Sequence, residues 1–303
     1  MSGEGYWQID SLGSRSTHPF TRERTKPVRA LFLGSSLMNG SAVIPVEQSM
    51  SAQLEDSLIE ALNFGSMRYE LDQVVLQYER RLAPFNATHL VVGLPGAGSQ
   101  GLLNRYLPFR FHFDVDDMPF VKPRAVLNDT GLIWLEPPSP GLWSSYLSKG
   151  DFLKAVSVTE GFHDRFTEYE ECAFTPIAAS VGSFVHRLGN LRRLLLGNQE
   201  SLPLELRLMD ELDVDAATNQ AHVVYLLFPD IEVVQPPGWR RFLPDHYHTL
   251  LDSLRAHGHV VLDIREVFRH SGLPPRDLYL NDGYHFSPRG NKLIAAAIRP
   301  YLL

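Results

Sequence analysis

Short apolar runs alternate along the chain with longer stretches in which apolar residues recur at every third or fourth position. The short runs have the length and composition of buried strands, and the longer stretches have the spacing of amphipathic helices. Because strands and helices take turns along the chain, we predict an α/β fold, a three-layer α/β/α sandwich with a mostly parallel sheet. The expected strands are 28–33, 62–64, 89–92, 132–135, 223–228 and 259–262, and the expected helices are 49–62, 71–82, 242–256, 264–270 and 288–298.

Two parts of the chain fall outside this alternation. Residues 1–27 are polar, and we expect an N-terminal arm that packs on the domain formed by residues 28–303, with its charged side chains in solvent. Residues 139–219 have helical spacing but no strand, which predicts a helical insertion that caps the site. The leucine-rich segment 188–196 is also compatible with a surface that pairs two copies of the chain, so the oligomeric state stays open.

The composition is that of an ordinary globular protein. Of the 303 residues, 44% are hydrophobic and 21% charged, which suits one large domain. The net charge of −7 argues against nucleic acid or an anionic membrane as a partner. No apolar run approaches the roughly 20 residues that span a bilayer, and no secretory h-region is present near the N-terminus. Because Cys172 is the one cysteine, no intrachain disulfide forms, and we expect a cytoplasmic protein.

The residues with the clearest chemical pattern lie near the two ends of the chain. Asp282 and His285 stand just before Ser287 and Pro288, which have the pattern of an N-cap and a first helical position. Ser36 follows the first strand, at the sheet edge where open α/β folds place their sites. A serine nucleophile needs an imidazole to take its proton and an acid to orient that imidazole. Taken alone, the segment with Asp282 and His285 is also compatible with a surface turn capped by an aspartate. The segment with Ser36 is also compatible with an ordinary Gly/Ser turn after a strand.

Together these segments resemble the SGNH, or GDSL-type, hydrolase superfamily. Segment 31–37 (LFLGSSL) is similar to its first block, with Ser36 on the nucleophile and Ser35 in place of the usual aspartate. Segment 282–285 (DGYH) is similar to its last block and supplies the acid and the histidine of the triad. The resemblance implies a flavodoxin-like sheet. Other similar segments are 62–65, 123–129 and 273–280.

The oxyanion residues of that superfamily are replaced in this chain. Its second block has a glycine five residues after an asparagine, and counted from Asn63 that place holds Arg68. Its third block has an asparagine whose place is taken by Gly98 or Ser99. Loss of one oxyanion donor typically costs about 10²–10³ in rate. The substitutes that we consider are the Arg68 guanidinium and the backbone N–H groups of residues 96–99.

The resemblance implies a serine-dependent hydrolase of small-molecule acyl esters or thioesters. In that mechanism Ser36 forms an acyl-enzyme, His285 is the base and Asp282 orients it. This chemistry needs no metal or other cofactor, and the acidic residues Asp114, Asp116 and Asp117 lack the spacing of a calcium-binding loop. Two alternatives stay open: an acyltransferase that uses the same triad, and a non-catalytic binding protein whose oxyanion hole is degraded. No recognisable sequence motif indicates the acyl length or the identity of the substrate.

Overall fold

The chain divides into two compact units. The structure, a computed structural model, describes residues 8–40, 44–96, 98–105, 121–137 and 201–303. The first unit contains a five-stranded sheet, and the second contains a two-stranded hairpin. Their bounds are Met1–Gly98 with Leu208–Leu303 for the first unit and Ser99–Arg207 for the second.

All neighbouring strands of the five-stranded sheet are parallel. The spatial order is β2-β1-β3-β6-β7, which is the flavodoxin-like order, with the first strand of the sheet inside and the second at the edge. From β1 the sheet extends on one side to β2 and on the other side to β3, β6 and β7, so the strand order reverses between β1 and β3. The predicted fold class is therefore confirmed. The strands are β1 (Val28–Leu33), β2 (Ile59–Asn63), β3 (His89–Pro95), β6 (His222–Phe228) and β7 (Val261–Asp263).

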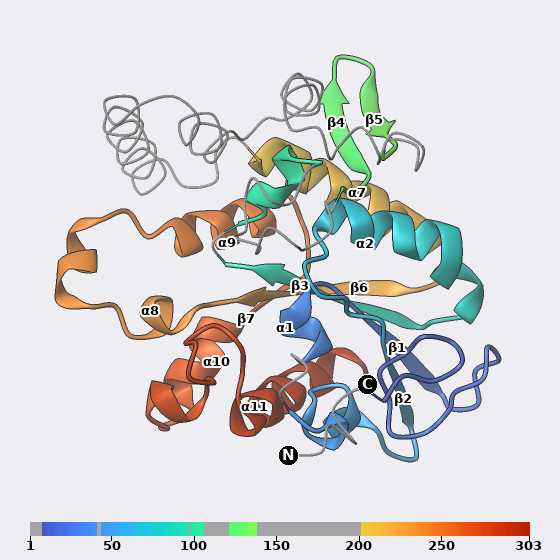
Figure 1. Cartoon of the computed structure of the whole chain (residues 1–303), viewed down its shortest axis with the longest axis horizontal. Coiled ribbons are helices and arrows are strands. Elements are labelled where there is room, and N and C mark those ends of the chain that lie inside the picture. Colours follow the sequence, from blue (N-terminus) through green and yellow to red (C-terminus); the bar gives the residue numbers. More distant parts are fainter. Residues whose placement is uncertain (1–7, 41–43, 97, 106–120, 138–200) are drawn as a thin grey trace, which may run out of the picture. The chain divides into compact units, whose positions relative to one another are not determined.

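Helices cover both faces of this sheet (Figure 1). One face carries α1 (Ser36–Asn39), α10 (Ile264–His270) and α11 (Pro288–Ile298). The other carries α2 (Leu71–Gln77), α9 (His246–Ala256) and the part of α7 (Leu202–Thr218) that belongs to this unit. A short α8 (Ile231–Val234) follows β6, and a π-helical turn (Tyr78–Leu82) extends α2. Single 3₁₀ turns are Val46–Gln48, Ala52–Leu54, Ala83–Phe85, Gln100–Leu103, Gly238–Phe242, Pro275–Asp277 and Arg299–Tyr301.

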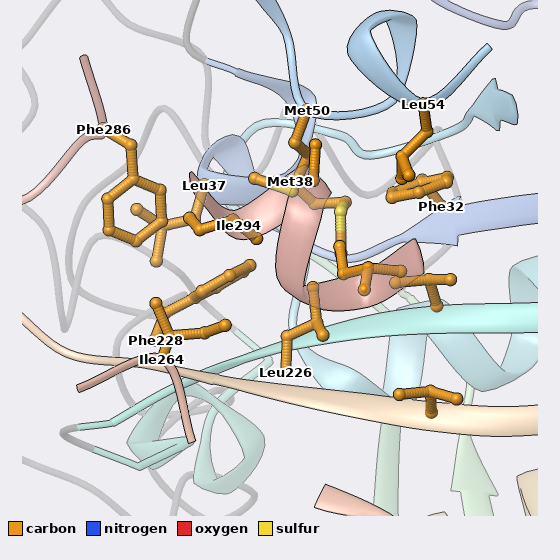
Figure 2. Packing of buried hydrophobic residues seen from close by; sticks show 14 of the residues in the cluster. Phe32, Leu37, Met38, Met50, Leu54, Leu226, Phe228, Ile264, Phe286 and Ile294 are labelled. Atoms are coloured by element: carbon orange, nitrogen blue, oxygen red, sulfur yellow. The ribbon is translucent and has the colours of Figure 1, made fainter. Parts of the chain in front are cut away.

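A large apolar cluster lies between the sheet and the α1/α10/α11 layer (Figure 2). The sheet contributes alternate residues, such as Phe32 of β1 and Leu226 and Phe228 of β6, because successive side chains of a strand point to opposite faces. Ile264 of α10 and Ile294 of α11 close the cluster from the other side. At roughly 1.5–3 kcal/mol for each fully buried large apolar side chain, this cluster is a major source of stability.

The helix predicted over residues 49–62 is wrong. The segment forms a 3₁₀ turn at Ala52–Leu54 and then β2, which pairs with β1 along its whole length. The carboxylate of Asp56 accepts hydrogen bonds from the N–H groups of Leu58 and Ile59, which turns the chain where the predicted helix would continue. Pairing with a buried strand therefore outweighs the local helical pattern.

The N-terminal arm lies along the edge strand of the sheet. Ser14 and Arg15 bond to Asn63 at the end of β2, and Phe20 is buried further along the arm. An edge strand that is covered in this way is protected from pairing with another chain. The expectation that the arm's charged side chains are solvated is wrong for Arg15, which is 2% exposed.

The second unit contains a hairpin of β4 (Arg124–Asn128) and β5 (Gly131–Leu135), which are antiparallel. The strand predicted at 132–135 is confirmed. The predicted insertion at 139–219 lies outside the described residues except for its last part. In that part, residues 202–218 are helical as expected and form α7.

Candidate active site

Ser36 lies at the sharp turn that joins β1 to α1. Gly34 has φ +145°, and a Cβ atom there would lie 3.1 Å from the Gly93 carbonyl oxygen of β3, so a glycine lets the turn pass close to the sheet. Ser35 is the N-cap of α1 and accepts a hydrogen bond from the Leu37 N–H. Ser36 is consequently the first helical residue, and its N–H has no intrahelical acceptor.

His285 and Asp282 lie in one tight loop before α11. One carboxylate oxygen of Asp282 accepts from the N–H groups of Tyr284 and His285, each at 2.9 Å. The other carboxylate oxygen lies 2.6 Å from His285 Nδ1. The Leu280 N–H donates to the His285 carbonyl at 2.7 Å, which fixes the backbone of the histidine. Ser287 caps α11 as predicted, because its hydroxyl accepts from the Gly290 N–H.

The structure brings Ser36, His285 and Asp282 together, although Ser36 and His285 are 249 residues apart in sequence. Ser36 Oγ lies 2.9 Å from His285 Nε2. Because an ionised carboxylate only accepts hydrogen bonds, Nδ1 of His285 carries the proton and Nε2 accepts from the serine hydroxyl. The three atoms are thus in the order that proton transfer from a serine requires.

The neighbours of Ser36 and His285 in the chain explain why the two side chains meet. Leu37 and Met38 follow the serine, Phe286 follows the histidine, and all three are buried in the apolar cluster of Figure 2. The Phe286 ring packs against the Phe228 ring at 5.1 Å between centroids. Hydrophobic burial therefore places both loops, and the polar contact between them needs little further ordering.

Asp282 remains a carboxylate although it is partly shielded. Partial burial alone would raise the pKa of this carboxyl, but hydrogen bonds from His285 and from the backbone N–H groups of Tyr284 and His285 outweigh it and hold the pKa below the ordinary value. The side chain of His285 is 21% exposed and that of Asp282 48% exposed. Both side chains are therefore in contact with solvent.

The segment after β2 packs against the backbone of α1. The Ser66 N–H donates to the Gly34 carbonyl at 2.9 Å, and the Asn39 amide donates to the Gly65 carbonyl at 2.8 Å. A Cβ atom on Gly65 would lie 2.5 Å from the Asn39 nitrogen, so this approach requires a glycine. The segment that resembles the second block of the SGNH superfamily is therefore held beside the serine turn.

Arg68 lies in that segment with a backbone conformation typical of glycine. Its φ is +63°, and the Tyr69 N–H donates to the Ser66 carbonyl at 3.2 Å, so residues 66–69 form a β-turn with Arg68 third. A positive φ at the third position is the mark of a type II turn, where glycine is preferred. Sequence reasoning considered only the guanidinium of Arg68. The left-handed backbone is a second feature that distinguishes this residue.

Gly98 and Ser99 use their polar groups within the protein. The Gly98 N–H donates to the Pro95 carbonyl at 2.9 Å, and the Gly96 N–H donates to the Phe228 carbonyl at 2.7 Å. Ser99 is buried in the second unit, and its hydroxyl donates to Glu205 at 3.0 Å. An oxyanion role for Gly98 or Ser99 stays a prediction.

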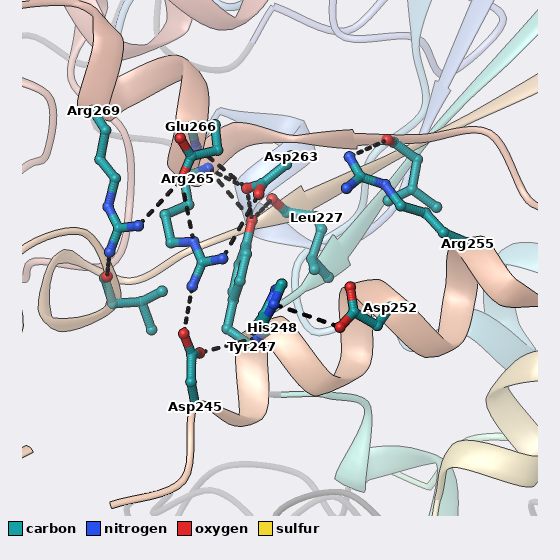
Figure 3. A network of polar contacts seen from close by, with 12 residues as sticks. Leu227, Asp245, Tyr247, His248, Asp252, Arg255, Asp263, Arg265, Glu266 and Arg269 are labelled. Atoms are coloured by element: carbon teal, nitrogen blue, oxygen red, sulfur yellow. Dashed lines mark hydrogen bonds and ion pairs between the residues drawn. The ribbon is translucent and has the colours of Figure 1, made fainter. Parts of the chain in front are cut away.

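A polar network at the ends of β6 and β7 supports the glycine-rich exit of β3 (Figure 3). The Tyr247 hydroxyl lies 2.8 Å from both the Leu227 carbonyl and the Asp263 carboxylate. Burial, together with the nearby Asp263 charge, raises the pKa of this phenol, so it stays protonated and donates. A Cβ atom on Gly96 would lie 2.4 Å from the Tyr247 ring.

Arg265 joins the caps of two helices in the same network. Its guanidinium lies 2.8 Å from Asp245, the N-cap of α9, and 3.8 Å from Asp263, the N-cap of α10. It also lies over the Tyr247 ring. Sequence reasoning missed this group, although an aspartate directly before each helix was a signal for the caps.

The segment after β6 is tied to the histidine loop. The Ile231 N–H donates to the Gly283 carbonyl at 2.9 Å, and the Tyr279 hydroxyl donates to the Pro229 carbonyl at 2.9 Å. Gly283 has φ +67°, and a Cβ atom there would lie 2.8 Å from the Ile231 side chain. The loop that carries Asp282 and His285 is thus fixed from the sheet as well as from α11.

The described part of the chain has neither a metal-binding cluster nor a membrane-spanning helix. Within it, no group of three or more His, Cys, Asp or Glu side chains is arranged to hold a metal ion. Among those same residues, no helix combines the length and the apolar character needed to span a membrane.

Comparison with known proteins gives structural similarity only. No protein-family model matches the sequence, and no curated protein matches it. The chain is similar to the crystal structure of Axe2, an acetylxylan esterase from Geobacillus stearothermophilus, with a TM-score of 0.46, 9% identity, and coverage of 91% of this chain and 94% of that chain.

Two other solved structures are similar over the same share of this chain. A protein from Desulfitobacterium hafniense, described as lipolytic and of the G-D-S-L family, has a TM-score of 0.43, 9% identity and 99% of its chain covered. LAE5, an α/β hydrolase from the metagenome of Lake Arreo in Spain, has a TM-score of 0.43, 10% identity and 94% of its chain covered. At these values no residue role carries over from those proteins to this chain.

Proposed function

We propose that the protein is a serine-dependent hydrolase of small-molecule acyl esters or thioesters. The observation that supports the proposal best is the chain of contacts from Ser36 Oγ to His285 Nε2, at 2.9 Å, and from His285 Nδ1 to Asp282, at 2.6 Å. The serine stands on a rigid turn, the imidazole has one protonated and one accepting nitrogen, and the acid is ionised. These are the requirements for an activated serine.

The reaction proceeds in two steps. Ser36 Oγ attacks the acyl carbon while its proton passes to His285 Nε2, and the tetrahedral intermediate collapses as His285 returns that proton to the leaving alcohol or thiol. Water then attacks the acyl-enzyme, gives a proton to His285, and releases the carboxylic acid as the serine regains its proton. Asp282 stays ionised throughout and stabilises the imidazolium that forms in each step.

The oxyanion is bound by backbone N–H groups. The first is that of Ser36, which lies at the N-terminus of α1 without an intrahelical acceptor. The second is the backbone N–H of Arg68. The positive φ of Arg68 gives its turn the shape that a glycine at this position would give. The bonds from Ser66 to Gly34 and from Asn39 to Gly65 support this assignment, because they hold that turn beside Ser36.

A steady-state and burst experiment with p-nitrophenyl esters of increasing acyl length tests this function. We expect a burst of p-nitrophenol with one equivalent per active site, or a linear release that depends on Ser36 and His285. Ser36→Ala and His285→Ala should each reduce turnover by several orders of magnitude. Turnover that is equal in both variants and the wild type would contradict the proposal.

Product analysis separates hydrolysis from acyl transfer. The same reaction is run with added glycerol or short alcohols as acceptors, and the free acid and the new ester are measured. We expect free acid as the main product. A new ester as the main product at low acceptor concentration would assign the same site to an acyltransferase, because only the access of water to the acyl-enzyme differs.

A further inference from the structure

Arg15 reaches from the N-terminal arm to the helix that carries Ser36. Its side chain is 2% exposed and is among the largest that are fully buried in the described residues. One guanidinium nitrogen donates to the Asn39 carbonyl at 2.8 Å, and the other donates to the Ile44 carbonyl at 2.6 Å. Asn39 is the last residue of α1, so the guanidinium binds the end of the nucleophile helix.

α1 is a single turn, so its own hydrogen bonds hold it weakly. The Gly40 N–H closes the turn by donating to the Ser36 carbonyl at 3.0 Å. The last carbonyls of a helix have no intrahelical donor and must find partners elsewhere. The Asn63 amide donates to the Met38 carbonyl at 3.0 Å, and Arg15 donates to the Asn39 carbonyl. Side chains from β2 and from the arm therefore replace the next turn of the helix.

The backbone of Arg15 is itself fixed. Its N–H donates to the Asn63 carbonyl at 2.8 Å, and the Asn63 N–H donates to the Ser14 hydroxyl at 2.9 Å. The Asp10 carboxylate accepts from the Leu12 and Ser14 N–H groups, which shapes the preceding turn. The guanidinium is thus presented to α1 from a segment that is bonded to the sheet, and its position is set before any substrate arrives.

Burying a cation is unfavourable, so a buried arginine is expected only where its hydrogen bonds compensate for the lost hydration. Burial lowers the pKa of the Arg15 guanidinium, and the nearby Glu47 carboxylate works in the opposite direction. A guanidinium nevertheless keeps its charge in proteins and offers several N–H donors in a rigid plane. That plane spans the Asn39 and Ile44 carbonyls at once, and a Cβ atom on Gly40 would lie 2.9 Å from it.

We infer that Arg15 is a positioning residue for Ser36, and that the N-terminal arm is part of the active site's support. By holding the end of α1, the guanidinium fixes where Ser36 Oγ stands relative to His285 Nε2. The inference rests on the proposed function, because a positioned serine matters only if it reacts. It does not require Arg15 to touch the substrate.

Labelling by a fluorophosphonate tests the inference. The second-order rate constant of Ser36 modification is measured for the wild type, Arg15→Met, Arg15→Lys and Arg24→Met, well below each unfolding midpoint and with native circular dichroism. Arg24→Met is the matched control, since that arm arginine is exposed and donates only to the nearby Pro27 carbonyl in the described contacts. Displacing a reacting group by about 1 Å costs on the order of 10²-fold. We expect about that loss for Arg15→Met, a smaller loss for Arg15→Lys, and the wild-type rate for Arg24→Met.

A chemical rescue separates positioning from stability. Methylguanidinium at millimolar concentration should raise the labelling rate of Arg15→Ala without changing that of Arg24→Met. Wild-type labelling rates in Arg15→Met, or losses that only follow the unfolded fraction, would overturn the inference and leave the proposed function intact. Failure of both Arg15→Met and Arg15→Lys to fold would assign Arg15 to folding instead. A wild-type protein that does not label at all would defeat the proposed function itself.

Discussion

At the scale of single residues, backbone hydrogen bonds hold both Asp282 and His285 of the proposed triad. Both oxygens of Asp282 are used, one by backbone N–H groups and one by His285, so the carboxylate cannot rotate freely. The sequence pattern predicted Ser36, Asp282 and His285 as a triad, because the chemistry of a serine nucleophile limits the residue types, and the structure brings the three side chains together. It did not identify Arg15 or Tyr247, since their contacts are distant in sequence and leave no local pattern.

Asp282→Asn is expected to reduce kcat while the fold is retained. The asparagine amide cannot stabilise the imidazolium and favours the wrong tautomer of His285, and comparable changes in serine triads cost on the order of 10⁴-fold. Asp277→Asn is the control, because Asp277 lies in the same region and forms an exposed ion pair with Arg289. Steady-state kinetics should show the loss in the first variant alone. Equal activities in the two variants would speak against a role for Asp282.

A second prediction for a single residue follows from the left-handed backbone of Arg68. Arg68→Gly removes the cost of a side chain at positive φ, so we expect it to raise the free energy of unfolding by about 1 kcal/mol. If the Arg68 N–H binds the oxyanion, turnover survives in both Arg68→Gly and Arg68→Ala. If the guanidinium is the donor, both variants lose about 10²–10³ in turnover. Denaturant unfolding and ester hydrolysis distinguish these outcomes, and we expect the first.

At the scale of elements, the sequence predicts those segments whose signals are local. β1, α10 and α11 have the predicted bounds. A short run in which Arg29 is the only charged residue marks β1, and Ser287 with Pro288 marks the start of α11. The strand predicted at 62–64 overlaps only the end of β2, whose first residues were mistaken for the end of a helix. Two of its five buried residues, Glu60 and Asn63, are polar, so the segment shows no apolar run, and only the pairing with β1 selects the strand.

Asp56 connects the start of β2 with the end of α11, and its effect should depend on pH. Hydrogen bonds from Arg299 and from the Leu58 backbone lower the pKa of this carboxyl from 3.8 to about 2. Because the pKa is lower in the folded state, the ionised carboxylate contributes stability above pH 4, and that contribution is lost as the pH falls towards 2.

Urea unfolding of Asp56→Asn between pH 6 and pH 2 measures this contribution. We expect the variant to have a lower midpoint than the wild type at pH 6, and the difference to shrink steadily below pH 4. Asp252→Asn, which changes an exposed aspartate on α9, is the control. A difference that stays constant over the whole range would show that Asp56 does not act through its charge.

At the scale of the whole molecule, the order of the strands brings the two ends of the sequence together. The serine turn follows β1 at the point where the sheet reverses its winding, and the histidine loop precedes the last helix on the same layer. The alternation of strands and helices predicted a mostly parallel sheet with helices on both sides, whereas the flavodoxin-like arrangement was implied by the resemblance to the SGNH superfamily. The contacts of Arg15 with α1 and the network around Tyr247 were not predictable, since both depend on packing between distant segments.

Covalent labelling of Ser36 measures directly whether this serine is an activated nucleophile. The wild type, Ser36→Ala and His285→Ala are treated with a fluorophosphonate, and the modified peptide is identified by mass spectrometry. We expect one adduct per chain, located on Ser36, and no adduct in Ser36→Ala or His285→Ala. Folded wild-type protein that takes up no label, or a label on another residue that persists in both variants, would contradict the claim that Ser36 is an activated nucleophile.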